Sequence, residues 1–313
     1  MLSTLLRRLG VALPTLLLVS MLVFGLQKLL PGDPAIALAG EERDPDVIAY
    51  LREKYRFNDP IPTQYIAWLG GVIQGDFGNS VRTRLPIGTM LAEKLPVTIE
   101  LAVLSMIVAI LIGLPIGIIA ALKRGSVLDY GSSFIGLVGL SIPNFWLGIM
   151  LILLFSVHLG WLPAGGYVAP SESLFGNLKS MLMPAFVLGT STAAMLMRHT
   201  RSAMLQTMRQ DYVRTARAKG SREKDVVVTH ALPNALIPVV TLGTLQFGEL
   251  LAGAVLTEQV FSIPGFGKMI VDGVFSRDYA VVQAVVLCTA AFFLLMSFLA
   301  DVAYTLLNPK LRG

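Results

Sequence analysis

Charged residues are scarce in this sequence. Only 14% of its 313 residues are Asp, Glu, Lys or Arg, whereas about 25% of an ordinary soluble domain is charged. Hydrophobic residues make up 54%, and the mean hydropathy is +0.69. The length alone would predict roughly two soluble domains, but long uncharged stretches recur along the whole chain. The composition therefore excludes a water-soluble globule and a disordered chain, and it indicates a polytopic membrane protein.

Cysteine and histidine are nearly absent. Cys288 is the only cysteine, so no internal disulfide and no Cys-x-x-Cys metal or redox site can form. The histidines, His158, His199 and His230, lie far apart in the sequence, and no His-Glu-x-x-His pair occurs. The sequence predicts no metal site and no cofactor bound to this chain.

A nucleotide-binding motif is also missing. A P-loop requires Gly, four residues and then Gly-Lys-Ser/Thr, because backbone amides must cradle the phosphates while the hydroxyl meets Mg²⁺. The only Gly-Lys pair, Gly267-Lys268, is followed by Met269, and Ser262 stands where the first glycine belongs. No hydrolase serine motif is present. We therefore predict no catalytic residues and no enzyme activity for this chain.

Six long apolar segments predict an all-α fold with six membrane spans. A bilayer core about 30 Å thick needs roughly 20 apolar helical residues. The first segment runs on to Leu29-Leu30 and Pro31 instead of ending in small residues, so we expect a retained span and not a cleaved signal peptide. The predicted spans are Leu9–Gln27, Leu101–Leu122, 134–157, Ser180–Met197, Asn234–Thr257 and Tyr279–Ala300.

The basic residues predict that both termini lie in the cytoplasm. This orientation places 14 of the 25 Lys and Arg residues inside, as the positive-inside rule expects. The net charge of +5 is then a topology signal, and no basic face with aromatic partners suggests a nucleic-acid site. The basic residues placed inside are Arg7, Arg8, Lys123, Arg124, Lys310, Arg312 and the eight between Arg198 and Lys224.

The spans divide the chain into four parts. They are a cytoplasmic N-terminus with the first span (1–30), an external helical loop (31–95), a five-span core (96–306) with a cytoplasmic loop at 198–233, and a cytoplasmic tail (307–313).

The external loop is too long for a plain connection and carries helix signals of its own. Asp44-Pro45 is typical of an N-cap followed by proline at the first helical position. A second short helix is expected to begin near Pro62, with Tyr65, Ile66 and Leu69 on one face. The segment can act as a cap that packs on the spans or as a docking surface for an external partner, and the sequence does not decide between them.

The inner loop predicts a helix–glycine–helix elbow. A first helix over about 200–218 is expected to end at Lys219-Gly220, because glycine most easily adopts the left-handed conformation that stops a helix. Ser221 is a plausible N-cap for a second helix, which Pro233 stops or bends. The elbow can dock another protein, with small Ala216 and Ala218 beside the bend, or it can be a basic loop that only anchors topology.

Ionisable residues inside predicted spans are candidates for function, because a charge at a helix centre costs roughly 2.5–3.5 kcal/mol on insertion scales. Glu249 is the clearest, about midway through the fifth predicted span. It either faces a polar pathway, together with Gln246, or is paired within the helix bundle. Glu100 and Asp301 lie at span edges and are expected to be structural.

Glycine and proline interrupt two spans. Gly113 and Gly117, with Pro115 between them, predict a close helix approach and a bend. In the third span Pro143 frees backbone groups that a neighbouring helix or cavity water must satisfy. Such breaks occur where a pathway is lined, so Ser141, Pro143 and Asn144 are pathway candidates.

One pattern in the inner loop resembles the signature of a known family. Arg214-Thr215-Ala216, three residues, Gly220, eleven residues and Leu232-Pro233 resemble the loop of ABC-transporter permease subunits, which reads Glu-Ala-Ala, three residues, Gly, nine residues, Ile, one residue, Leu-Pro. Arg214, Thr215 and His230 depart from that pattern. Four other stretches resemble the peptide and nickel branch of the family: Pro31-Gly32-Asp33-Pro34, Gly75-Asp76-Phe77-Gly78, Phe261-Ser262-Ile263-Pro264-Gly265-Phe266-Gly267 and Asn308-Pro309.

The resemblance implies a permease subunit with the fold of type I ABC importers, in the inner membrane of a bacterium. It implies as partners a second related permease, two ATPase subunits that hold ATP and Mg²⁺, and an external substrate-binding protein. Substrates of the branch include dipeptides, oligopeptides, glutathione-like thiols and nickel complexes, and the sequence does not choose among them. The residues expected to contact the ATPases are Arg214, Thr215, Ala216, Arg217, Ala218, Lys219, Gly220, Ser221, Leu232 and Pro233.

Two other functions stay open. A gradient-driven secondary transporter of small polar solutes would use Glu249 as its ionisable site, although no inverted repeat is visible in the sequence. A structural membrane protein would have no transport role, and the strongly basic elbow argues against it.

Overall fold

A computed structural model describes residues 2–29, 35–36, 44–54 and 58–307. The motif Pro31-Gly32-Asp33-Pro34 and the ending Asn308-Pro309 lie outside the described residues. The chain divides into two compact units. The first unit comprises Met1–Leu5, Val97–Lys268 and Phe292–Gly313, and the second comprises Leu6–Pro96 and Met269–Ala291.

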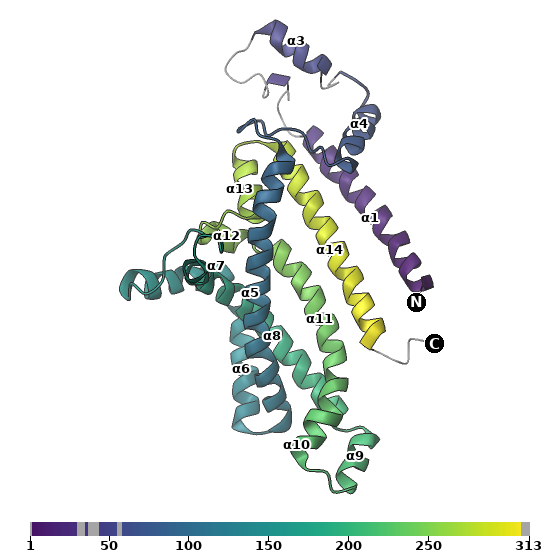
Figure 1. Ribbon diagram of the computed structural model, residues 1–313, viewed down its shortest axis with the longest axis vertical. Helices are drawn as coiled ribbons and strands as arrows, with labels where there is room; N and C mark the ends of the chain where they lie inside the picture. Colours follow the sequence, from purple (N-terminus) through teal and green to yellow (C-terminus); the bar gives the residue numbers. More distant parts are fainter. Residues whose placement is uncertain (1, 30–34, 37–43, 55–57, 308–313) are drawn as a thin grey trace. The chain divides into compact units, whose positions relative to one another are not determined.

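Within the described residues the chain is helical and contains no strand, only an isolated bridge between Asn79 and Pro86. This agrees with the all-α prediction. The helices, labelled in Figure 1, are α1 (Leu2–Leu29), α3 (Pro45–Lys54), α4 (Ile61–Ile73), α5 (Ile87–Leu122), α6 (Val127–Ser141), α7 (Asn144–Leu151), α8 (Leu174–Thr207), α9 (Asp211–Ala218), α10 (Glu223–Asp225), α11 (Leu232–Gly253), α12 (Val255–Val260), α13 (Phe266–Phe275) and α14 (Tyr279–Leu307).

Five of the described helical segments are long and apolar enough to cross a membrane. They correspond to five of the six predicted spans, with ends that differ by up to 14 residues, at the start of the second span. A sixth crossing is present only if one bent pair of helices counts as one span. The five segments are Gly10–Lys28, Ile87–Leu122, Leu174–Thr207, Glu223–Ala252 and Tyr279–Thr305.

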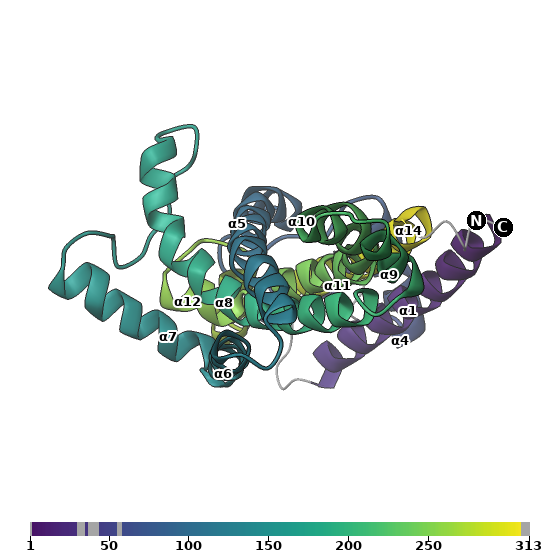
Figure 2. The ribbon, with the colours of Figure 1, turned by 90° about the horizontal axis from the view of Figure 1, so that it is seen from below.

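The third predicted span is not one straight helix. Val127–Ser141 and Asn144–His158 meet at an angle of 97°. Ile142, which precedes the proline, has an extended conformation (φ −77°, ψ 124°), because the ring of Pro143 disfavours a helical residue before it. In Figure 2, α6 is seen almost end-on while α7 runs away from it. The predicted break at Pro143 is confirmed, and the third span expected over 134–157 coincides with this bent pair, whose geometry fits a broken span or a re-entrant loop.

Helix α8 is the centre of the first unit. It packs against α6, α7, α11 and α12, and its most apolar stretch is 72% buried. Glycines bring α5 close to it: a Cβ on Gly113 would lie 2.6 Å from the Ala193 carbonyl oxygen, and one on Gly117 would lie 2.6 Å from the Met197 carbonyl oxygen. The close helix approach predicted from these two glycines is confirmed.

Two helix boundaries differ from the sequence prediction. Helix α5 begins at Ile87, so the end of the predicted external loop already belongs to the helix of the second span. The predicted helix over 200–218 is two helices, because α8 ends at Thr207 and α9 begins at Asp211. Gln210 has an extended ψ of 149° at this break, and Asp211 favours a new helix start because its charge complements the helix dipole.

The external segment contains the two predicted helices. The Asp44 carboxylate accepts a hydrogen bond from the Asp46 amide at 2.9 Å, which confirms the predicted N-cap. Helix α4 begins at Ile61, one residue before Pro62. Tyr65 and Leu69 are half-buried as expected, but Ile66 is 68% exposed. Ile66 therefore does not share their packed face.

Candidate functional site

The turn at Gly220 closes α9 with a complete hydrogen-bonded cap. Gly220 has a φ of +82°, the left-handed conformation predicted for it. Its amide donates to the Arg217 carbonyl at 2.9 Å, and the Ser221 amide donates to the Ala216 carbonyl at 3.3 Å. These two bonds form a Schellman motif, which satisfies the last carbonyls of a helix. The chain thus leaves α9 along a defined path.

A side-chain pair holds the two arms of this elbow together. The Arg217 guanidinium donates to both oxygens of Glu223, from Nε at 3.1 Å and from Nη2 at 2.6 Å. Ser221 is not the N-cap of the following helix, since that position belongs to Arg222 and no side chain caps it. The Ser221 N-cap prediction is therefore wrong, and the contact between Arg217 and Glu223 supplies the local order.

The elbow has its own small core. Val213, Ala216 and Val226 are buried together, with Met208 packed against them. Ala216 is therefore turned inward, whereas Ala218 is exposed. The exposed face of α9 carries residues at helical spacing i, i+3, i+4 and i+7, which lie on one side of a helix: Asp211, Arg214, Thr215 and Ala218.

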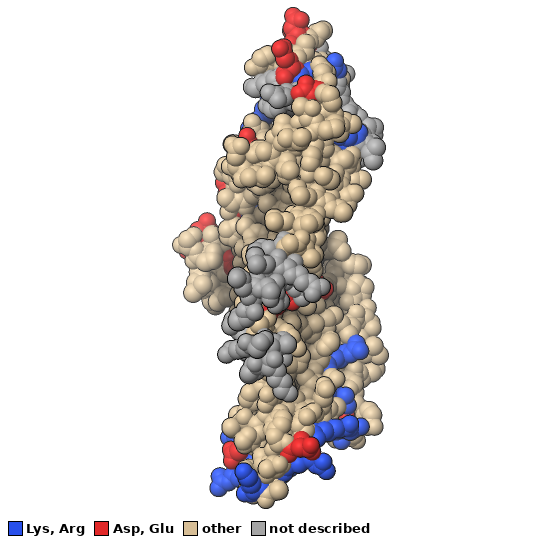
Figure 3. Space-filling model, turned by 90° about the vertical axis from the view of Figure 1, so that its right-hand side faces the viewer, with Lys and Arg blue, Asp and Glu red and all other residues tan. Residues whose placement is uncertain are grey.

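The base of the elbow is fixed to the ends of three long helices. Ala121 of α5, Met204 of α8 and Ala235 of α11 form one buried cluster with Val227 and Ala231, and Leu232 packs against it. Pro233 is exposed in the first turn of α11, which directly follows the π-helical turn Val226–Ala231, so the chain stays helical through the proline. Figure 3 shows Lys and Arg side chains gathered over this end.

A bidentate ion pair joins α6 to α8 close to the same end. The Arg201 guanidinium donates to Asp129 from Nε at 2.6 Å and from Nη2 at 2.9 Å, and the Gly125 amide donates to Asp129 at 3.0 Å. Asp129 is almost wholly buried. Sequence reasoning did not single out this pair. The available signal was Ser126-x-x-Asp129, a capping pattern whose Ser126 hydroxyl accepts from the Asp129 amide.

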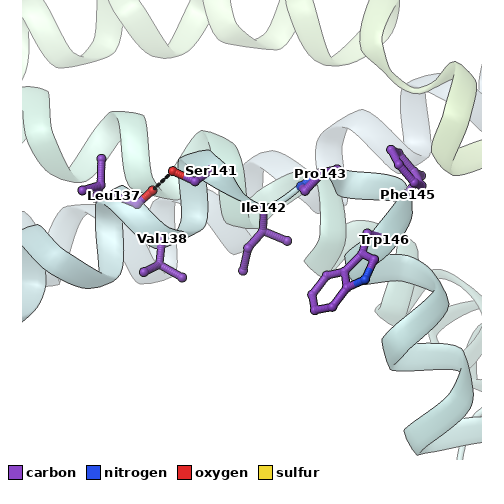
Figure 4. A pocket seen from close by; sticks show the side chains of 7 residues that line it. All are labelled: Leu137, Val138, Ser141, Ile142, Pro143, Phe145 and Trp146. Carbon is purple, nitrogen blue, oxygen red and sulfur yellow. Dashed lines mark hydrogen bonds between the residues drawn. The ribbon is translucent and has the colours of Figure 1, made fainter.

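The bend between α6 and α7 forms an open, mostly apolar pocket of about 490 Å³. Ser141 and Pro143 line it, and the Ser141 hydroxyl donates to the Leu137 carbonyl at 2.8 Å (Figure 4). Asn144, the first residue of α7, is not part of its lining. The remaining lining residues are Leu137, Val138, Ile142, Phe145 and Trp146.

Gln246 and Glu249 lie on α11, outside this pocket. The buried Gln246 amide donates to the exposed Glu249 carboxylate at 2.8 Å. Glu249 stands in the last turns of α11, which ends at Gly253. It is therefore nearer a helix end than the predicted midpoint of a span. The pocket at the bend and the polar pair on α11 are two separate features of the first unit.

A different glutamate is the most deeply buried acid of the described residues. Glu258 is 0% exposed. Its carboxylate accepts from the Thr98 hydroxyl at 2.7 Å and from the Lys268 amide at 3.0 Å, while Thr98 accepts from the Phe266 amide at 2.8 Å. Burial raises the pKa of Glu258, against the opposing effect of these hydrogen bonds. Glu258 and Thr98 thus cap the N-terminus of α13.

The glycines around this carboxylate are required because a side chain at either position would clash with its neighbours. A Cβ on Gly265 would lie 2.3 Å from Glu258 Oε1, and one on Gly267 would lie 2.3 Å from the Val255 Cα atom. Phe261 and Ile263 of the same motif are buried in the main core. The sequence marked this motif only through its resemblance to the permease family. In the structure it has a packing role. Glu258 was missed because nothing in the local sequence marks it as buried.

Glu100 has a structural role, as predicted from its position at the edge of a span. It accepts from the Tyr167 hydroxyl at 2.8 Å and from the Asn177 amide at 2.6 Å. Burial, reinforced by the bond to Glu100, raises the pKa of Tyr167 to about 12. The hydroxyl therefore stays protonated and donates to Glu100 at any physiological pH.

Among the residues that the structure describes, no three His, Cys, Asp or Glu side chains are grouped as metal ligands. Apolar helices, a broken helix pair and a cationic elbow are together the features of a polytopic membrane transport protein.

The comparisons place the chain more narrowly. The chain belongs to the family of binding-protein-dependent transport system inner membrane components, whose model matches residues 113–313. A second family model, for the N-terminal part of these membrane components, matches residues 1–102. It is 44% identical to the di/tripeptide transport system permease protein DppB of Pseudomonas aeruginosa, covering 100% of this chain and 99% of that protein. It is 40% identical to the oligopeptide transport system permease protein AppB of Bacillus subtilis, covering 100% of both.

Solved structures agree on the fold. An inward-facing structure of the MetNI methionine ABC transporter superimposes with a TM-score of 0.58 at 20% identity, covering 70% of this chain and 96% of that one. A crystal structure of an amino acid ABC transporter with histidines gives 0.52 at 15% identity, covering 69% and 93%. The fold is that of the permease subunits of type I ABC importers.

Proposed function

We propose that this chain is the transmembrane permease subunit of a bacterial ABC importer for peptides or peptide-like solutes. Full-length identity of 40–44% to permeases named for dipeptides, tripeptides and oligopeptides is the observation that carries this proposal. Dipeptides, oligopeptides, glutathione and nickel complexes all belong to the range of solutes to be tested. The bilayer holds the apolar helices, and both termini lie in the cytoplasm.

The complete importer contains three kinds of protein partner for this chain. A second homologous permease completes the pathway, two ABC ATPases bind from the cytoplasm, and a periplasmic or extracellular binding protein delivers the solute. ATP and Mg²⁺ bind on the ATPases, and this chain carries no nucleotide site and no catalytic residue. The exposed carboxylate of Glu249 supports a second permease, because a charge on an apolar helix needs a polar neighbour or water.

The elbow transmits the ATPase motion. Its exposed face of Asp211, Arg214, Thr215 and Ala218 offers one charge of each sign beside two small residues, which suits close contact with another protein. Arg217, Lys219, Gly220 and Ser221 hold the shape of the turn, and Ala216 fills its core. Leu232 and Pro233 connect it to α11. A force applied to α9 therefore moves the ends of α5, α8 and α11 together, through the cluster at the base.

The translocation pathway follows the polar and broken features of the first unit. Ser141, Pro143 and Asn144 lie at the 97° bend, where the helix is weakest, and Gln246 and Glu249 offer the polar groups on α11. Alternating access then consists of rocking this chain against the second permease. Both ligand and ATP must bind one arrangement better than the other for such a shift to occur.

The first experiment is purification of the tagged chain in mild detergent from native-level expression, followed by identification of the proteins that accompany it. P-loop ATPases, a second permease and a binding protein are the expected companions. The chain alone, or a homo-oligomer, would overturn the proposal. The binding protein recovered in this way is the route to the solute, by measuring which peptides it binds.

A second experiment tests the elbow. Gly220→Pro cannot adopt a φ of +82° and loses the amide that bonds Arg217. We expect normal membrane insertion and loss of solute-stimulated ATPase activity in the purified complex. Gly220→Ala is the control. It is expected to retain part of the coupling, because alanine in the left-handed conformation costs only about 1–2 kcal/mol.

The exposed Glu249 also favours a second candidate, a gradient-driven transporter of small polar solutes. That candidate requires uptake without any ATPase and complete loss of uptake in Glu249→Gln. The importer requires that uptake stops without the ATPase and that Glu249→Gln loses only part of its uptake. Uptake by cells lacking the ATPase genes therefore separates the two.

A further inference from the structure

Helix α4 is an uncharged helix with no buried residue. Its 13 residues, Ile61–Ile73, contain no Asp, Glu, Lys or Arg, and the nearest flanking charges are Asp59 and Asp76. A soluble connecting helix normally carries charges on its free face. A hydrophobic stretch of 10–14 residues is typical of a core helix or of a re-entrant or interfacial membrane segment, and the core alternative does not fit a helix without buried residues.

One side of α4 packs on the first membrane helix (Figure 1). The Tyr65 hydroxyl and the Ser20 hydroxyl are 2.7 Å apart, and Phe24 lies against both Tyr65 and Trp68, with ring centroids 5.5 Å and 5.4 Å away. The Lys28 ammonium donates to Gln64. These contacts belong to one compact unit, so they fix α4 against α1.

The contact with Ser20 sets the depth of α4. The apolar span of α1 ends at Lys28, and Ser20 lies eight residues before it. At 1.5 Å per residue this is about 12 Å along the helix, well inside a hydrocarbon core about 30 Å thick. Tyr65 therefore sits at the level of the acyl chains of the adjoining leaflet.

The other side of α4 is apolar and open. Ile66 is 68% exposed and Ile73 is 77% exposed, and residues seven apart lie on the same helix face. The exposed leucines of α1 at the same depth, Leu18, Leu22 and Leu26, lie on the side of α1 turned away from Ser20 and Phe24. The α1–α4 pair is thus apolar on both of its outer sides.

The ends of α4 also suit an apolar medium, where unpaired backbone groups cost several kcal/mol each. Pro62 has no amide hydrogen, which removes one of the unpaired donors of the first turn. At the other end the amides of Gln74 and Asp76 donate to the Gly71 carbonyl, and the Gly75 amide donates to the Val72 carbonyl. These bonds pair three amides with two carbonyls at the C-terminal end of the helix.

We propose that α4 lies within the bilayer, in the leaflet next to the C-terminal end of α1, with phospholipid acyl chains covering Ile66 and Ile73. At about 20 Å the helix is too short to cross the membrane, so it enters and leaves by the same face. This assigns a lipid-binding role to part of the long segment between the first two spans. It does not depend on the solute or on the ATPase partners.

The test is depth-dependent fluorescence quenching on the full chain in phosphatidylcholine vesicles. Single cysteines at Ile66→Cys and Ile73→Cys, in a Cys288→Ser background, carry an environment-sensitive fluorophore. Tyr50→Cys on the charged helix α3, 60% exposed, is the matched control. We expect lipids with a spin label in the acyl chain to quench positions 66 and 73 at least several-fold more than position 50, and aqueous iodide to show the reverse order.

Quenching of positions 66 and 73 by iodide would overturn the proposal, because it would place α4 in water. Protection from both quenchers would overturn it as well, because it would mean that protein covers this face. The two labelled positions are independent, and each is an exposed side chain whose replacement removes no packing contact with α1. A folding failure at one therefore leaves the other to decide.

Discussion

Arg201 and Asp129, 72 residues apart in sequence, meet through two hydrogen bonds from one guanidinium to one carboxylate. The carboxylate is nearly buried and the guanidinium is about one-third exposed. The pair ties the first turn of α6 to the last two turns of α8. The bent helix pair is thereby anchored at the same end of the first unit as the elbow.

Asp129→Asn is expected to destabilise the chain. Asparagine has one acceptor oxygen instead of two and no charge, so at least one of the bonds from Arg201 is lost, and a hydrogen bond to a charged group contributes about 1.5–3 kcal/mol. The midpoint of thermal unfolding in detergent should fall clearly. Arg214→Ala is the control, because its contact with Asp211 is 3.4 Å long and fully exposed, and such pairs contribute little. Equal effects of both variants would contradict this role for Asp129.

Arg217→Ala is expected to loosen the elbow without unfolding the helices. It removes both hydrogen bonds to Glu223, an exposed pair, so the loss of global stability should be at most about 1 kcal/mol. Solute-stimulated ATPase activity of the complex should nevertheless fall, because α9 and α10 are no longer held together. The measurement compares ATPase stimulation with the unfolding midpoint.

The charge-reversed double variant Arg217→Glu with Glu223→Arg restores the pair in the opposite sense. Recovery of coupling in the double variant, relative to either single variant, identifies the contact itself as the cause. No recovery would contradict a coupling role for the contact between Arg217 and Glu223.

Gly117→Ala is expected to disturb the packing of α5 on α8. Its Cβ would lie 2.6 Å from the Met197 carbonyl oxygen and 2.8 Å from the Thr200 Cβ, and overpacking of this kind costs about 1–3 kcal/mol. Gly131→Ala in α6 is the matched control, since its Cβ would meet nothing within 4 Å. Alanine should raise stability there by about 0.5–1 kcal/mol. Unfolding midpoints of the two variants should move in opposite directions.

Glu258 and Glu249 are expected to respond differently to the same substitution. Glu258→Gln must turn its amide nitrogen toward either Thr98 or the Lys268 amide, which leaves one buried donor unsatisfied and costs about 1–3 kcal/mol. Glu249→Gln changes an exposed side chain and should shift stability by less than about 0.5 kcal/mol. Thermal unfolding in detergent distinguishes them, and a larger loss at position 249 would contradict the burial of Glu258.

The sequence predicts those features of the fold that have a local cause. Apolar runs locate the membrane helices, Gly220 locates the left-handed turn, and Gly113 with Gly117 locates a close helix contact. The break at Pro143 follows from the missing amide of proline, although its 97° angle depends on how α6 and α7 each pack against α8.

Features that depend on distant residues are not visible in this way. The burial of Glu258 requires Thr98 and the start of α13 to come together, and the partner of Asp129 lies on another long helix. The end of α8 at Thr207 has no glycine or proline to announce it. Of the candidate site residues, those of the Gly220 turn were found from local signals, whereas the contact of Arg217 with Glu223 required the structure.

Helix α8 runs unbroken from Leu174 to Thr207, a length of about 51 Å. One end carries Asn177, bonded to Glu100, and the other carries Arg201 and Met204, at the base of the elbow. Such a rod can act as a lever: Leu174 lies about 40 Å from Arg201 along the helix, so a tilt of about ten degrees around Arg201 moves the Leu174 end by roughly 7 Å. A displacement of a few ångströms at the end next to the elbow is thereby enlarged at the opposite end, with no change in the helix itself.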